Sequence, residues 1–146
     1  MFKLFLFCYF PVFAALPIVG WVHGEDVVSN SDAKAEEILG RFSIIGDIEK
    51  TPFILQITFE NCRELKDAYG NALSLASLKL KYQNAQSSWE TMDLRISARG
   101  QNCFNNIEFY NDVQETYNME LWASWDRQRA AAGIFHGNAF FKILPR

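Results

Sequence analysis

The side chains that could do chemistry in this chain are few, because only two histidines and three cysteines occur among its 146 residues. The sequence holds no glycine-rich phosphate loop, no Gly-x-Ser-x-Gly motif and no pair of histidines at metal-binding spacing. His136 stands alone in a strand-like segment, without a nucleophile beside it in the sequence. Covalent catalysis needs a nucleophile and a base within hydrogen-bond reach. We therefore expect no enzymatic activity, no metal and no other cofactor.

The cysteines divide between the start of the chain and its body. Cys8 lies within an apolar run at the N-terminus, whereas Cys62 and Cys103 lie in the remainder. In an exported protein an isolated pair of cysteines most often closes one disulfide. The sequence favours a Cys62–Cys103 bond, and two buried free thiols are the alternative.

Aromatic residues near the C-terminal third offer a second kind of chemistry, which is stacking on a sugar. Tyr117, Trp122 and Trp125 lie close together in the sequence, and the charged run Asp126–Arg129 follows them. Large aromatics in strand-like segments are more often core residues than ligand contacts. We favour a core role for the aromatics and a solvated turn for the charged run over a carboxylate-recognition patch.

The first 24 residues have the pattern of a secretory signal, with Lys3 followed by an apolar run that carries no charge until Glu25. Small residues allow cleavage after Ala14, Gly20 or Gly24, so the cut falls within residues 14–24. An uncleaved membrane anchor is the alternative. Residues 25–146 are then a single domain, of ordinary length for one.

The charge balance argues against a nucleic-acid partner. The formal net charge of the whole chain is −3, and it becomes −4 when Lys3 is removed with the leader. Phosphate binding needs a basic face, and the sequence contains none.

The body of the chain reads as a series of strands with one apolar face each. The clearest lies in "TPFILQITFENC", where alternate residues are apolar. These predicted core residues are Phe53, Leu55, Ile57 and Phe59. Residues 116–125 fit a helix and a strand equally well, but their neighbours are short strands between turn signals, which favours a strand. The predicted fold is an all-β sandwich.

The last fourteen residues, "GIFHGNAFFKILPR", also have the two-residue period of a half-buried strand. The small or apolar positions are Gly133, Phe135, Gly137, Ala139, Phe141 and Ile143.

This C-terminal pattern resembles the last strand of chaperone–usher fimbrial subunits, the pilins of Gram-negative bacteria. In that family a glycine stands fourteenth from the end, as Gly133 does, and alternate apolar residues follow. The segment "TPFILQITFENC" is similar to the family's second strand, "EILG" to the element before it and "MELWASW" to the penultimate strand. Pro145 stands where the family has a penultimate tyrosine, and the upstream cysteine that usually pairs with Cys62 is absent.

The resemblance implies an immunoglobulin-like sandwich that lacks its final strand and is completed by a donated one. A periplasmic chaperone and then a neighbouring pilin subunit would supply that strand, with an outer-membrane usher directing assembly. The residues from Gly133 to Ile143 named above would line the groove, and the carboxylate of Arg146 would be held by the chaperone. Ile18, Gly20 and Val22 would form a donor strand if cleavage is early.

The resulting functional hypothesis is a fimbrial subunit, exported to the periplasm and then displayed on the cell surface, that contributes to adhesion. A subunit with a groove but no donor strand would terminate assembly. The alternative is a self-contained periplasmic or secreted β-sandwich that binds a ligand or protein and whose last strand completes its own sheet.

Overall fold

The structure is a computed structural model that describes residues 17–25, 27–29, 36–46, 52–84, 86–96, 102–109, 116–126 and 132–146. The predicted leader up to residue 16, with Cys8 and Ala14, and residues 127–129 of the charged run lie outside these ranges. The described residues form strands and no helix. The strands are β1 (Ile18–Gly24), β2 (Val27–Ser29), β3 (Glu36–Ile45), β4 (Phe53–Phe59), β5 (Glu64–Lys66), β6 (Ala72–Gln83), β7 (Trp89–Leu94), β8 (Cys103–Phe109), β9 (Thr116–Trp125), β10 (Gly133–Phe135) and β11 (Ala139–Pro145).

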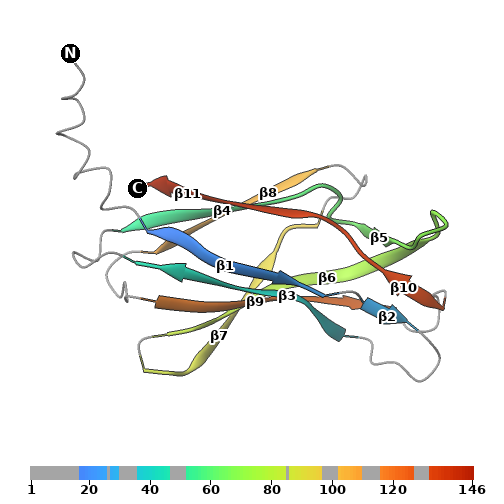
Figure 1. Cartoon of the computed structure of the whole chain (residues 1–146), viewed down its shortest axis with the longest axis horizontal. Helices are drawn as coiled ribbons and strands as arrows, with labels where there is room; N and C mark the ends of the chain where they lie inside the picture. The colour runs from blue at the N-terminus through green and yellow to red at the C-terminus, as the bar shows by residue number, and fades with distance from the viewer. Residues whose placement is uncertain are drawn as a thin grey trace, which may run out of the picture.

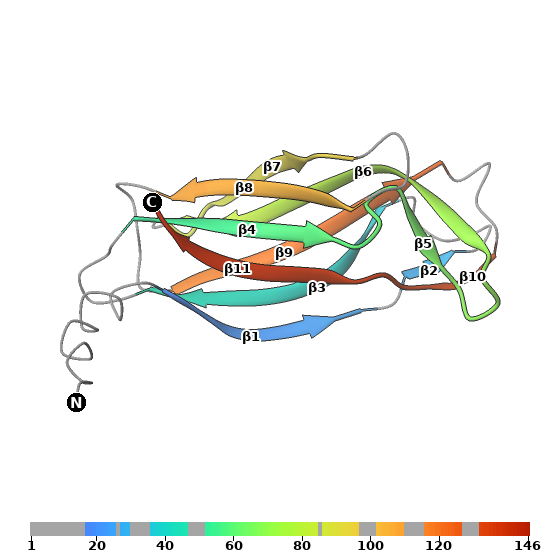
Figure 2. The same cartoon turned by 90° about the horizontal axis from the view of Figure 1, so that it is seen from above.

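The strands form two facing layers. One layer is a three-stranded sheet in the order β11-β4-β8, and the other contains β1-β3-β9-β6, with β5 and β7 both paired to β6. A short ribbon of β2 and β10 lies at one end. Figure 1 shows the smaller sheet above the larger one, and Figure 2 shows β4 between β8 and β11. The prediction of an all-β sandwich is confirmed.

Immunoglobulin sandwiches have one sheet in the order A-B-E-D and a second that contains C-F-G. Here the larger sheet runs β1-β3-β9-β6, and β11 lies beside β4 in the smaller sheet. Taken in chain order as A to F, the six longer strands β1, β3, β4, β6, β9 and β11 give the orders A-B-E-D and C-F, and no described strand lies in the place of G beside β11. The incomplete immunoglobulin-like sandwich that the resemblance implies stays a prediction, because β8 and the short strands add to this arrangement.

The apolar alternation in the sequence decides which face of each strand is buried. All four predicted core residues of β4 are buried, with exposures of 0 to 5%. Strand β9 resolves the ambiguous segment as a strand, because its buried residues recur at every second position. These are Tyr117, Met119, Leu121, Ala123 and Trp125.

Four aromatic rings join the two layers near the ends of their strands. The ring of Phe53 stacks on Phe109 within the smaller sheet, with centroids 5.0 Å apart. Both rings meet Tyr117 of the opposite sheet edge-on, at 5.7 and 5.0 Å, and Phe109 also meets Tyr82, at 5.5 Å. Edge-to-face pairs of this kind add about 0.5–1.5 kcal/mol each to the burial of the rings.

The hairpin from β6 to β7 is fixed by a hydrogen-bonded turn. The side chain of Asn84 accepts bonds from the backbone N–H groups of Gln86 and Ser88, at 3.0 and 2.9 Å. Its amide donates to Glu90 at 2.8 Å, and the hydroxyl of Tyr82 also donates to Glu90, at 2.9 Å. These two bonds lower the pKa of the Glu90 carboxyl below its ordinary value. The turn thus sets the register of β7 on β6.

Two phenylalanines of the smaller sheet provide a matched test of the buried face. We expect Phe53→Ala to lower the free energy of unfolding by about 3–5 kcal/mol, because it leaves a cavity among the four rings. Phe104→Ala should change it by less than about 0.5 kcal/mol, because Phe104 lies on the outer face and is 57% exposed. Urea unfolding followed by tryptophan fluorescence measures both. Equal losses would show that the faces of the sheet are assigned wrongly.

Candidate functional site

The C-terminal strand β11 lies at an edge of the smaller sheet, because among the described strands it pairs only with β4. Ala139, Phe141 and Ile143 are half-buried and pack against the core, whereas Phe140 and Lys142 are exposed on the outer face. Upstream in the same segment, Phe135 is fully buried, and Gly133 and Gly137 lie at the surface or half-buried. The predicted alternation thus holds, apart from the irregular backbone at His136–Asn138.

The backbone groups of β11 follow the same alternation. The carbonyl oxygen of Asn138 accepts a bond from the N–H of Glu60 at 3.1 Å, and the two residues face each other in the β11–β4 register. In an antiparallel pair, alternate residues bond to the partner strand. Phe140 and Lys142 therefore bond toward β4, while the N–H and C=O groups of Phe141 and its odd-numbered neighbours point to the free edge. The same residues turn their side chains inward and their backbone groups outward.

A cavity of about 200 Å³ lies beside this edge, where β1 and β3 of the larger sheet approach β11. Apolar side chains from both sheets form most of its lining. They are Val22, Leu39, Phe42, Phe59, Leu65, Leu75, Leu78, Leu121, Ala139 and Phe141. Polar groups that also line it are His23, Glu25, Arg41, Asn61, His136 and Asn138. The site is therefore an apolar recess next to unpaired strand backbone.

One ring contact crosses this side of the sandwich. Phe42 of β3 meets Phe141 of β11, with centroids 4.3 Å apart and the rings tilted by 35°. Phe42 is buried, and Phe141 is half-buried and lines the cavity. Among the described residues, this contact joins the two layers on the side where the cavity lies.

The start of the C-terminal segment is held at several points. Backbone bonds run in both directions between His136 and Lys66, at 2.9 and 3.0 Å. A Cβ on Gly137 would lie 2.9 Å from Leu65, so no larger residue fits there without movement. The amide of Asn138 donates to Glu60 at 2.6 Å. These contacts fix the position at which the free edge of β11 begins.

A turn next to this segment is stabilised by one carboxylate. The amide of Asn71 donates to Asp67 at 2.9 Å, and this bond is the main cause that lowers the pKa of Asp67 below its ordinary value. Backbone N–H groups of Asn71 and Tyr69 add bonds of 2.8 and 2.9 Å. Gly70 has φ +85°, which favours glycine. The turn joins β5 to β6 and so positions Leu65 against the cavity.

The predicted donor residues lie on β1, which pairs with β3 of the same chain. Ile18 and Val22 are 61% and 57% exposed, although Val22 also borders the cavity. Gly20 lies against Ser43 and Ile45 of β3. In this structure the three residues therefore extend the larger sheet of their own chain.

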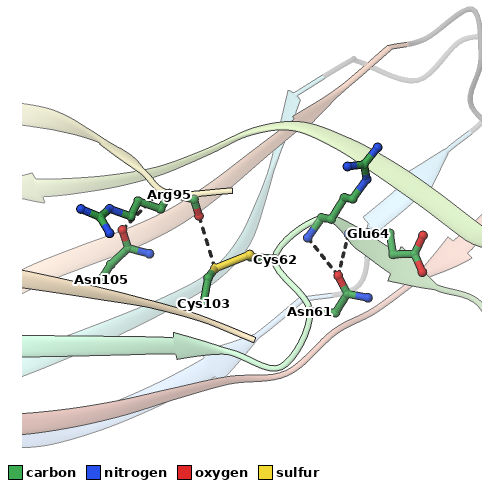
Figure 3. Close-up of a disulfide and its surroundings, with 7 residues drawn as sticks. Asn61, Cys62, Glu64, Arg95, Cys103 and Asn105 are labelled. Atoms are coloured by element: carbon green, nitrogen blue, oxygen red, sulfur yellow. Dashed lines mark hydrogen bonds between the residues drawn. A yellow bond between two sulfur atoms is a disulfide. The ribbon is translucent and has the colours of Figure 1, made fainter. Parts of the chain in front are cut away.

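The predicted disulfide between Cys62 and Cys103 is present. It links the residues after β4 to the first residue of β8, with the two Cα atoms 6.1 Å apart. Figure 3 shows Asn61 beside it, whose side-chain oxygen accepts bonds from the N–H groups of Arg63 and Glu64 at 3.0 and 3.3 Å. The bond and this turn together hold the end of β4 near the cavity.

A buried amide lies near the disulfide, on the face of β8 that looks inward. The oxygen of Asn105 accepts a bond from the N–H of Arg95 at 2.9 Å. Its Nδ2 is buried without a hydrogen-bond partner in the described structure. This polar group belongs to the core rather than to the lining of the cavity.

The three aromatics considered for sugar stacking do not share a surface. Tyr117 and Trp125 are buried in the core, at 2% and 4% exposure. Trp122 points to the outer face, where its indole N–H donates to Glu120 at 3.1 Å and the amino group of Lys81 lies 4.1 Å from the ring centre. The core interpretation is correct for two of the three.

Chemistry-bearing side chains are not gathered elsewhere in the part of the chain that the structure describes. No group of three or more His, Cys, Asp or Glu side chains there is arranged to hold a metal ion. No helix in the same residues has the length and apolar character needed to cross a membrane.

Sequence reasoning did not identify the floor of the cavity. Phe42, Leu78 and Leu121 come from strands that are far apart in the chain, and only the order of strands brings them together. The apolar residues Phe42 and Ile44, at alternate positions, could have indicated that β3 has a buried face. They could not indicate which strand lies beside β3.

Comparisons with known proteins leave the family open. No protein-family model matches the chain, and no curated protein matches its sequence. Among solved structures, it is similar to the CBM22-1 xylan-binding domain of Xyn10C from Paenibacillus barcinonensis, at 9% identity and a TM-score of 0.35. The alignment covers 89% of this chain and 86% of that domain. A TM-score of this size does not establish a common fold.

The disulfide closes a long loop and should contribute substantially to stability. The two cysteines are 41 residues apart. In the chain-entropy description, a loop of that length makes the bond worth about 4 kcal/mol. We expect the double variant Cys62→Ala/Cys103→Ala to lose about that much in urea unfolding without reductant. Reducing the native protein should give a similar loss, and a loss below about 1 kcal/mol from both would contradict the account.

Proposed function

We propose that the protein is a fimbrial subunit of the chaperone–usher class, exported to the periplasm and incorporated into a surface fimbrium. Its C-terminal strand β11 would first receive a strand from a periplasmic chaperone. A neighbouring subunit would then replace that strand at the outer-membrane usher. The function that follows is structural, as part of an adhesive fibre, rather than catalytic.

The observation that supports this proposal is that β11 combines an unpaired backbone edge with inward apolar side chains. Its odd-numbered residues direct unpaired backbone groups to a free edge and apolar side chains toward the core, and two of them, Ala139 and Phe141, line a cavity of about 200 Å³. A strand added at such an edge gains main-chain hydrogen bonds, and its alternate side chains enter pockets that fix its register. An edge of this kind also invites aggregation unless it is covered.

Two features of β11 limit what can be added to it. Pro145 has no N–H, so the last position offers only a carbonyl group to a partner strand. Lys142 is exposed on the outer face, where charge discourages unspecific contact with other sheets. A partner strand would therefore gain most of its bonds from Ala139, Phe141 and Ile143.

The contact between Phe42 and Phe141 favours a second candidate, a self-contained β-sandwich binding protein. That contact, together with the pairing of β10 with β2, partly closes the same side of the sandwich with residues of the same chain. In this case the edge of β11 would be a permanent surface, and the cavity would be a ligand site. The two candidates differ in whether added backbone stabilises the protein.

Strand addition is tested with a short synthetic peptide that alternates valine with threonine. A peptide that pairs with β11 should raise the melting temperature of the purified exported protein. At a hundredfold excess over its Kd the stabilisation is about 2.7 kcal/mol. The matched control is the same peptide with alternate backbone amides N-methylated, which removes the donors. A stable monomer that responds to neither peptide would contradict the fimbrial proposal and favour the self-contained sandwich.

The two faces of β11 provide a second test, with a pilus chaperone co-expressed in the periplasm. Phe141→Asp should abolish co-purification with the chaperone, because it places a charge in the apolar recess. Lys142→Asp should have much less effect, because that side chain lies on the outer face. Phe141→Leu, which keeps an apolar side chain, should retain capture and separates loss of the site from loss of folding. Equal capture of both aspartate variants would contradict the register.

A further inference from the structure

The junction of β1 and β3 is built around two glycines, one on each strand. A Cβ on Gly20 of β1 would lie 2.6 Å from the hydroxyl oxygen of Ser43 and 2.8 Å from the side chain of Ile45. A Cβ on Gly40 of β3 would lie 2.8 Å from the backbone carbonyl oxygen of His23. Each strand thus lacks a side chain where the other approaches. A close fit of this kind between β1 and β3 is expected of two strands that stay together in the folded domain. It is not expected of a leader that is removed.

A backbone hydrogen bond and an ion pair connect the residue after β1 to β3. The N–H of Glu25 donates to the carbonyl oxygen of Leu39 at 2.8 Å. Arg41 forms an ion pair with Glu25, and its Nε lies 3.4 Å from Glu120 of β9. Arg41 therefore ties the end of β1 to the centre of the larger sheet.

The side of β1 that faces the interior also makes contacts. Val19 packs against the hydrophobic core, and Pro17, just before β1, is buried. Val22, His23 and Gly24 form part of the cavity lining. Removal of the segment would uncover the edge of β3 and one wall of the cavity.

We propose that Ile18–Gly24 is a permanent strand of the mature domain, and that processing of the predicted leader cuts the chain upstream of Ile18. Of the three positions that the sequence allows, only the one after Ala14 meets this condition. A cut after Gly20 would divide β1, and a cut after Gly24 would remove it. This inference does not depend on the fimbrial proposal, because it rests on the contacts of β1 with β3 alone. In a fimbrial subunit it means that Ile18, Gly20 and Val22 complete their own sheet and do not serve as the donor strand.

The direct test is the N-terminus of the exported protein. The full chain is expressed in a Gram-negative host, recovered from the periplasm and examined by N-terminal sequencing and intact mass. We expect a chain that begins at Ala15. Any processed start up to Ile18 retains β1 and supports the inference, whereas an unprocessed Met1 would contradict the proposed cut. A start at Trp21 or Glu25 would overturn it.

A stability measurement on the same exported protein tests whether β1 is docked. Gly40→Ala should lower the melting temperature by about 4 °C, because the new Cβ must displace the backbone of His23. The matched control is Gly24→Ala, since a Cβ there meets nothing within 4 Å. If β1 is absent from the folded protein, the obstacle at Gly40 is absent too. Equal melting temperatures for the two variants would then overturn the inference, even if the mass shows that the segment is still attached.

Discussion

The central position of β4 is the constraint on which the rest of the structure depends. Every odd-numbered residue of β4 is buried, and its two edges are occupied by β8 and β11. Phe53 of this strand contacts Tyr117 of the larger sheet edge-on. Because burial on one face fixes register, a slip of one residue would turn all four apolar side chains to water. The disulfide at Cys62, just past the end of β4, holds this strand to β8, and β8 and β11 are the two edge strands of the sheet in the described structure.

Strand β11 is less buried than its apolar alternation predicts. The interior strand β4 and the other edge strand, β8, both bury their odd-numbered residues, whereas Ala139, Phe141 and Ile143 remain partly accessible. An edge position therefore does not by itself account for the difference. What distinguishes β11 is the cavity that Ala139 and Phe141 line, so the burial that β11 lacks and the space that a partner would fill lie on the same side.

Sequence periodicity predicted the faces of the strands but not their neighbours. The alternation in residues 53–59 and 139–145 gave the correct inward side chains, and the strand neighbours of residues 116–125 correctly favoured a strand there. The disulfide was predicted from the count of cysteines. The order of the strands did not follow from this periodicity, because a two-residue period is the same whichever strand lies alongside. For the same reason the floor of the cavity was missed: Phe42 and Leu121 meet only because β3 pairs with β9. The role of β1 was hidden by its apolar composition, which also fits a leader.

The two ends of the described chain border the same recess, and this restricts where a partner strand can lie. Strand β3 has β9 on one edge and β1 on the other, so it has no free backbone while β1 is docked. Strand β11 has β4 on one edge only. If β1 is permanent, the strand edges that border the recess are its own and that of β11, and a partner paired with β11 would fit its side chains between Phe141 and the wall formed by Val22 and His23. If β1 were removed, the edge of β3 would be open to the same partner. Retention of β1 thus removes the edge of β3 from competition for an added strand.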